Sequence, residues 1–198
     1  MHRPLILASI ACALVVVATG CGSSSGSSSS SSTTASTAKS GEVSPTGDIP
    51  DTQAFVAFTA PSRNYTIKVP EGWAQSTAGT KLTFTSHFNT VSVETGTSAS
   101  APTPASVRTV DLPSLQLDSG FRLVSIKTEP RTAGPATVVT YQVESAPDPV
   151  TGKRIALDAQ RYQFWRNGQL VTITLAAPKG SDNVDAWKTI TNAFAWSQ

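Results

Sequence analysis

Short runs in which apolar and polar side chains alternate are the feature that most constrains the fold of this chain. In residues 64–69, Tyr65, Ile67 and Val69 fall on one face of an extended segment and polar side chains on the other. Further strand-like runs span 81–86, 91–95, 121–128, 136–145, 155–165 and 169–177. Because a strand with one apolar face must bury that face against another layer, the pattern predicts a mainly antiparallel sheet joined by hairpins.

Two segments of the chain have helical signals, and one dipeptide marks a tight turn. Thr103 followed by Pro104 is typical of a helix start, which predicts a short helix from Pro104 to about Asp111. Asn167-Gly168 is the pair favoured in a two-residue type I′ hairpin. Near the C-terminus, Asp182 is placed to cap a longer helix whose apolar stripe comprises Val184, Trp187, Ile190 and Phe194.

The segment that can fold runs from residue 51 to residue 198, which we interpret as a single α+β domain. Both cysteines lie at or before position 21, so the domain has neither a disulfide framework nor a cysteine-based zinc site. Thirteen basic residues alternate with eleven acidic residues in this range without clustering. A nucleic-acid surface needs a basic stripe, so nucleic acid is excluded as an expected partner.

The N-terminus has the form of a targeting segment. An apolar run of 13 residues, 5–17, is too short for a spanning helix of about 20 residues. It is followed by Ala18-Thr19-Gly20-Cys21, which resembles the lipobox of bacterial lipoproteins. The resemblance implies a signal peptide over residues 1–20, cleavage between Gly20 and Cys21, and a diacylglyceryl group on Cys21. The alternative is an ordinary secretory signal that leaves Cys21 free.

Residues 21–50 connect this site to the domain. From Gly22 to Ser40 every residue except Lys39 is Ser, Gly, Thr or Ala, and residues 42–50 contain Pro45, Gly47 and Pro50. Such a segment has no apolar surface to offset the entropy of ordering, so it is predicted to be a disordered tether. A flexible chain of this length spans on the order of 30 Å, so the domain is expected at the extracytoplasmic face of the cell membrane.

Two stretches of the domain resemble a known superfamily. The segment from Tyr65 to Trp73, a strand followed by Pro-Glu-Gly-Trp, is similar to the opening of PsbP-like/Mog domains and of actinobacterial LpqN-type lipoproteins. The segment from Asp185 to Phe194 is similar to the terminal helix of the same group. The resemblance implies an α/β/α sandwich around an antiparallel sheet. It implies no catalytic residues, because members of the group are mostly accessory or partner-binding proteins.

A search for chemistry identifies no catalytic set, metal site or cofactor motif. His87 is the one histidine after the targeting segment and falls in a predicted hairpin loop, where an exposed polar role is the favoured interpretation. No Gly-x-Ser-x-Gly motif, dinucleotide-binding motif or phosphate-binding loop occurs. Asp148 and Asp158 could form a carboxylate pair, although ordinary turn and edge positions explain both.

Aromatic side chains in the strand 155–165 are the remaining candidates. Phe164 and Trp165 are adjacent and must point to opposite faces of a sheet. Trp and Arg are favoured interface residues, so Trp165 with Arg161 and Arg166 forms a candidate partner patch. The alternative is that helices cover both faces of the sheet and leave no patch.

These observations predict a membrane-anchored cell-envelope lipoprotein, carrying a non-enzymatic binding or accessory module for a protein or a small apolar ligand. Two other classes stay open: an envelope hydrolase that uses Asp, Ser or Tyr, and a structural assembly factor of a membrane complex. A deep pocket with convergent carboxylates would favour the hydrolase, and an apolar cavity would favour a small-ligand carrier. A flat exposed patch around Trp165 would favour a protein partner.

Overall fold

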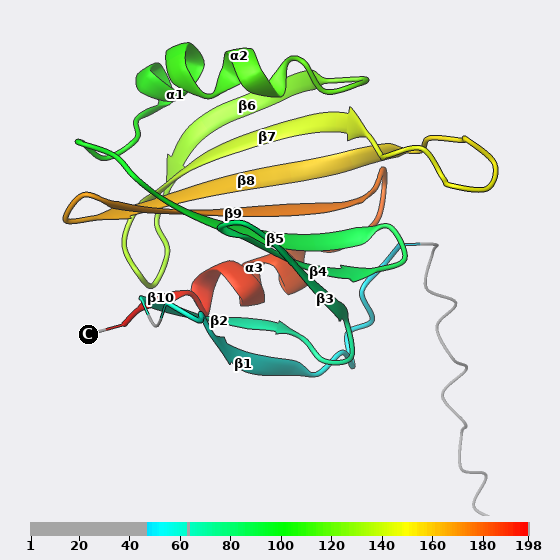
Figure 1. The fold of residues 1–198 in the computed structure, drawn as a ribbon, viewed down its shortest axis with the longest axis horizontal. Coiled ribbons are helices and arrows are strands. Elements are labelled where there is room, and N and C mark those ends of the chain that lie inside the picture. The colour runs from blue at the N-terminus through cyan, green and yellow to red at the C-terminus, as the bar shows by residue number, and fades with distance from the viewer. Residues whose placement is uncertain (1–46, 63, 198) are drawn as a thin grey trace, which may run out of the picture. The chain divides into compact units, whose positions relative to one another are not determined.

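A computed structural model describes residues 47–62 and 64–197 of the chain (Figure 1). The predicted signal peptide, Gly20, Cys21 and the tether up to residue 46 lie outside this range. No helix in the described part is long and apolar enough to cross a membrane. Its elements are β1 (Phe55–Thr59), β2 (Tyr65–Pro70), β3 (Ala74–Ala78), β4 (Lys81–Ser86), β5 (Asn89–Thr97), α1 (Pro104–Val110), α2 (Leu112–Leu115), β6 (Arg122–Glu129), β7 (Ala136–Glu144), β8 (Ala156–Arg166), β9 (Gln169–Pro178), α3 (Val184–Asn192) and β10 (Ala195–Trp196).

The strands form two antiparallel sheets. The larger has seven strands in the order β3-β4-β5-β9-β8-β7-β6, and the smaller has three in the order β1-β2-β10. After β5 the chain crosses through α1 and α2 to the far edge of the large sheet, and then returns through three hairpins until β9 pairs with β5. The predicted antiparallel sheet is therefore confirmed.

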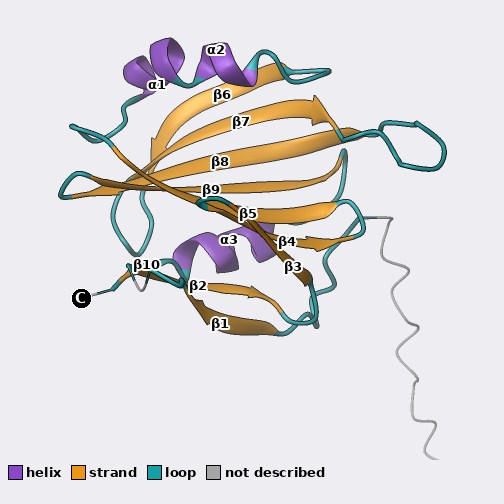
Figure 2. Cartoon of the chain, in the orientation of Figure 1, coloured by secondary structure: helices purple, strands orange, loops and turns teal. Residues whose placement is uncertain are grey.

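The large sheet is covered on both faces, as Figure 2 shows. On one face, α1 and α2 enclose a core that contains Val107, Val139 and Tyr141. On the other face, α3 and the small sheet enclose a larger core. Phe194 connects the layers of that core, since its ring centroid lies 4.4 Å from Phe164 of the large sheet and 5.9 Å from Tyr65 of the small sheet.

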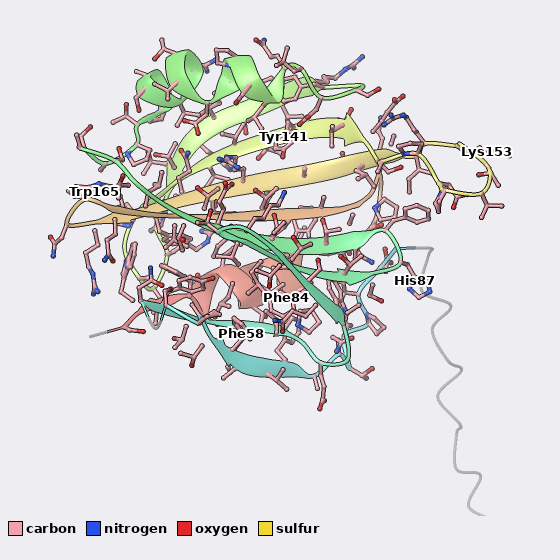
Figure 3. All side chains as sticks on the ribbon, viewed as in Figure 1. Phe58, Phe84, His87, Tyr141, Lys153 and Trp165 are labelled. Atoms are coloured by element: carbon pink, nitrogen blue, oxygen red, sulfur yellow. The ribbon has the colours of Figure 1, made fainter. Side chains whose placement is uncertain are left out.

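The expected α/β/α sandwich matches only in part. One covering layer is the short pair α1–α2, but the other combines α3 with the sheet β1-β2-β10, which the sequence pattern did not predict. Strand β3 was also missed, because all five of its residues are exposed and show no apolar alternation. Phe58 of β1 contacts Phe84 of β4 edge-to-face at 5.2 Å, and this pair joins the two sheets (Figure 3).

The predicted hairpin turn and first helix are present. Asn167 and Gly168 have φ values of 51° and 83°, the positive values that a type I′ turn requires. Helix α1 begins after Thr103, whose side-chain oxygen accepts a hydrogen bond from the backbone N–H of Ser106. These features depend on residues close together in the chain, which is why the sequence alone predicts them.

The prediction for the C-terminal helix needs two corrections. The N-cap is Asn183 rather than Asp182, and its side chain makes no capping bond within the helix. The apolar stripe is also incomplete: Ile190 is buried, but Val184 is 70% exposed because it precedes the part of α3 that packs on the core. Phe194 is buried beyond the last helical residue.

Candidate ligand-binding pocket

A pocket of about 390 Å³ lies at one end of the domain. Four segments far apart in the sequence form it: the first described residues, the β2–β3 turn, the β4–β5 turn and the end of β9. We call it the end pocket. Its lining residues are Gly47, Asp48, Ile49, Pro50, Gln53, Trp73, Ser86, His87, Phe88, Asn89 and Pro178.

The buried amide of Asn183 holds the first wall of this pocket in place. Its Oδ1 accepts a hydrogen bond of 2.6 Å from the backbone N–H of Ile49. Its Nδ2 donates to the carbonyl oxygen of Gly47 at 3.0 Å and to Oδ1 of Asn89 at 3.1 Å. Residues 47–50, which the sequence assigned to the tether, are therefore packed against the domain, and Ile49 is buried.

Two turns supply the aromatic side chains of the pocket. Trp73 follows Gly72, whose φ of 81° allows the sharp reversal after β2. In the β4–β5 turn, His87 has a φ of 53° and its Nδ1 lies 3.3 Å from Oγ of Ser86, while Phe88 remains 39% exposed. The predicted loop position of His87 is confirmed, and the structure adds that this loop lines a pocket.

The chemistry of the lining is that of a binding site for an apolar molecule. Its lining is mostly apolar and includes the side chains of Ile49, Pro50, Trp73, Phe88 and Pro178. The ionisable members, Asp48 and His87, do not belong to any metal-binding group of three within the described residues. Ligand pockets are typically of this volume and carry few polar groups on an apolar lining.

A second hollow, of about 320 Å³, lies between α3 and strands β6 to β8. Its lining is also mostly apolar, and two of its polar side chains already have partners: Gln142 Nε2 donates to Asp158 Oδ1 at 3.0 Å, and Asp158 Oδ2 accepts from the backbone N–H of Gly180 at 3.0 Å. The end pocket has the larger volume of the two and is therefore the better candidate.

The predicted partner patch is not gathered at one place. Arg161 and Trp165 point to the face covered by α1 and α2, where Arg161 pairs with Asp111 at 3.7 Å. The indole N–H of Trp165 donates to the carbonyl oxygen of Ser98 at 2.8 Å. Arg166 points to the opposite face, where its guanidinium lies 5.0 Å from the ring centroid of Trp196. Opposite orientation of adjacent strand residues explains this separation.

The two aspartates considered as a carboxylate pair each have a structural partner. Asp148 Oδ1 accepts from the backbone N–H of Thr151 at 2.7 Å, and this bond closes the β7–β8 turn. The same bond, with a second from the hydroxyl of Thr151, lowers the pKa of Asp148 below its usual value. Asp158 is bound within the second hollow as described above.

A half-buried polar network was not predicted from the sequence. Nη2 of Arg131 donates to Oε2 of Glu129 at 2.5 Å and to the hydroxyl oxygen of Tyr162 at 3.0 Å, while its Nε donates to Oγ1 of Thr191 at 3.1 Å. The Tyr162 hydroxyl donates to Oε1 of Gln160 at 2.6 Å, and burial raises the pKa of Tyr162. The network joins the β6–β7 loop to α3, so we assign it a structural role.

Comparison with known proteins shows the fold. No protein-family model and no curated protein matches the chain. The cyanobacterial PsbP protein (CyanoP) of Synechocystis sp. PCC 6803 matches 79% of this chain and 99% of its own length, with 17% identity and a TM-score of 0.51. The described domain therefore has a PsbP-like fold, as the sequence resemblance implied.

Two other solved structures are more distant. LpqN of Mycobacterium tuberculosis, described as involved in cell envelope biogenesis, matches with 12% identity and a TM-score of 0.45 over 75% of this chain and 93% of its own. A Bacteroides thetaiotaomicron protein matches with 10% identity and a TM-score of 0.47 over 72% of this chain. This chain spans about half (48%) of the length of the Bacteroides protein.

Proposed function

We propose that this chain is a non-enzymatic binding module of the cell envelope, attached by a lipid on Cys21 to the outer face of the cytoplasmic membrane, that takes a small apolar ligand. The observation that carries the proposal is the end pocket. It combines a volume of about 390 Å³ with a lining of two aromatic rings, two prolines and Ile49.

Between a small ligand and a protein partner, the placement of the candidate patch favours the ligand. Trp165 and Arg166 face opposite sides of the sheet and each has an intramolecular partner. Between a carrier and a hydrolase, the lining favours the carrier. It holds Asp48, Ser86 and His87, but a Ser-His-Asp triad needs a hydrogen bond from the imidazole to the carboxylate. Among the described residues no such bond joins His87 to Asp48, whose Oδ1 accepts from the backbone N–H of Asp182 instead.

Ligand binding can be tested with the hydrophobic dye anilinonaphthalene sulfonate and with extraction of lipids from protein purified out of its native envelope. We expect the dye to fluoresce with the native protein and to be displaced by the co-purified molecule. Trp73→Ala should reduce dye binding, because it removes the largest apolar side chain of the pocket. Trp165→Ala is the matched control at the other end of the molecule (Figure 3). Equal dye binding in all three proteins would contradict the proposal.

The anchor is tested separately by metabolic labelling with palmitate. The native chain should incorporate the label and a Cys21→Ala variant should not. Incorporation into both would contradict the lipid anchor without affecting the pocket.

A further inference from the structure

We propose that the end of the domain that carries the pocket docks directly onto the lipid bilayer, with Val150 and Phe88 inserted among the lipids. This inference rests on the proposed function for the anchor, and goes beyond it by giving the domain a membrane-contacting face of its own. That face comprises the β4–β5 turn, the β7–β8 loop and the β9–α3 loop.

Hydrogen bonds and pocket contacts link these three segments to each other. Phe88 and Pro178 line the same pocket, and the next residue, Lys179, donates its backbone N–H to the carbonyl oxygen of Ala156 at the base of the β7–β8 loop. Figure 3 shows His87 and Lys153 at the same end of the long axis, opposite Trp165. The three segments therefore form one surface.

The surface presents apolar side chains to solvent at the tips of its loops. Val150 is 90% exposed and Phe88 is 39% exposed. Neither side chain is needed to build the two cores, since neither belongs to them. A bilayer would bury both side chains, and the transfer of apolar surface out of water is favourable.

The charges around these tips give a mixed surface. Lys153, Arg154 and Lys179 are exposed on it, and Asp148 closes the turn next to Val150. Asp48 and Asp182 are also nearby, joined by a bond of 2.9 Å from the backbone N–H of Asp182 to Oδ1 of Asp48. The basic and acidic side chains balance, so apolar insertion rather than attraction to anionic lipid would drive docking.

The segment that leads from Cys21 joins the domain at the end that carries this surface. Gly47, the first described residue, lines the pocket at this end, and 25 residues separate it from Cys21. The disordered tether predicted from the sequence would span about 28 Å at that length, so a lipid-anchored domain would sample the bilayer at a millimolar effective concentration. A weak affinity of the domain for lipid is then sufficient for docking. The docked pocket would open next to the bilayer, from which an apolar ligand could enter it.

The experiment uses a chain beginning at residue 42, which retains both cores in one compact unit and contains no cysteine. Val150→Cys and Val110→Cys variants are labelled with an environment-sensitive nitrobenzoxadiazole dye. Val110, on α1, is 73% exposed and serves as the matched control. Vesicles of phosphatidylcholine mixed with phosphatidylglycerol are added to millimolar lipid, which matches the effective concentration that the tether would give. They should shift the emission of the label at position 150 to the blue and leave that at position 110 unchanged.

A second pair of variants measures affinity in the vesicle titration. Val150→Asp should reduce partitioning into vesicles by about tenfold, the change expected for losing one buried valine side chain, whereas Val110→Asp should not change it. No shift at position 150, or equal shifts at both positions, would overturn docking and favour a protein partner for this surface. Dye binding in the pocket, measured without vesicles, would be unaffected by Val150→Asp, so failure of docking is distinguishable from failure of the proposed ligand site.

Discussion

Replacing Asn183 by alanine tests whether one buried amide holds the pocket wall. The side chain is 3% exposed and makes three hydrogen bonds, of which that from the Ile49 backbone N–H is the shortest at 2.6 Å. Loss of the amide leaves this N–H without its partner in a buried site, which costs about 1–3 kcal/mol, and the two other bonds contribute about 1 kcal/mol each. We expect the free energy of unfolding to fall by about 3–5 kcal/mol.

The assay is calorimetry together with urea titration. For a domain of this size, each kcal/mol corresponds to about 2–4 °C, so the melting temperature should fall by about 6–20 °C. Hydrogen exchange at the Ile49 amide should accelerate more than exchange in the central strands. Because residues 47–50 form one wall of the pocket, dye binding should weaken in the same variant.

Asp182→Ala is the control, because the sequence predicts Asp182 as the helix cap. Its backbone N–H donates a hydrogen bond to Oδ1 of Asp48, and alanine retains this N–H. Its stability should therefore change by less than about 0.5 kcal/mol. A loss below about 1 kcal/mol in Asn183→Ala, or equal losses in the two variants, would refute the reasoning.

Three further predictions concern other parts of the fold. Phe164→Ala removes a ring that is 1% exposed and should lower the free energy of unfolding by about 3–5 kcal/mol in urea titration. Gly47→Ala should be less stable than Gly72→Ala by about 1–3 kcal/mol in the same assay: both positions have positive φ, but only a Cβ at Gly47 would meet a proline carbon, at 2.5 Å. Burial raises the pKa of Glu129, but hydrogen bonds and charges from the adjacent lysine and arginine outweigh it and lower the pKa overall. The contribution of ionised Glu129 to the free energy of unfolding is therefore complete above its unfolded pKa of about 4.3 and is lost as the pH falls through the lower folded pKa. Urea midpoints measured against pH should show this dependence in the native chain and not in Glu129→Gln.

Local signals predicted the strands and turns that depend on neighbouring residues. Alternation located β4 with its observed bounds and β2 to within one residue at each end, and Asn167-Gly168 located the β8–β9 turn. The same method missed β1, β3 and β10. These strands are short or lack alternation, and their pairing is decided by partners elsewhere in the chain.

Predictions for the candidate site residues were accurate only where the deciding contacts are close in the sequence. The sequence correctly showed that Phe164 and Trp165 face opposite ways, yet it still grouped Trp165 with Arg166, which by the same alternation point to opposite faces. It placed His87 in a loop but gave no sign of a pocket there. The end pocket joins residues from both ends of the described chain, so no local pattern could have identified it.

The sequence by itself determined most strands of the large sheet and the short helix after Thr103, because each depends on residues that are neighbours along the chain. The attachment point at Cys21 stays a prediction from the same kind of local pattern. Only the tertiary structure shows that a second, small sheet packs beside α3 on one face of the large sheet. It also shows that hydrogen bonds from Asn183 hold residues 47–50 against the domain. The bonds of Asn183 to Gly47 and Ile49 span more than 130 residues. Contacts of that length form only when the whole chain has packed, so the pocket is a property of the fold and not of any segment.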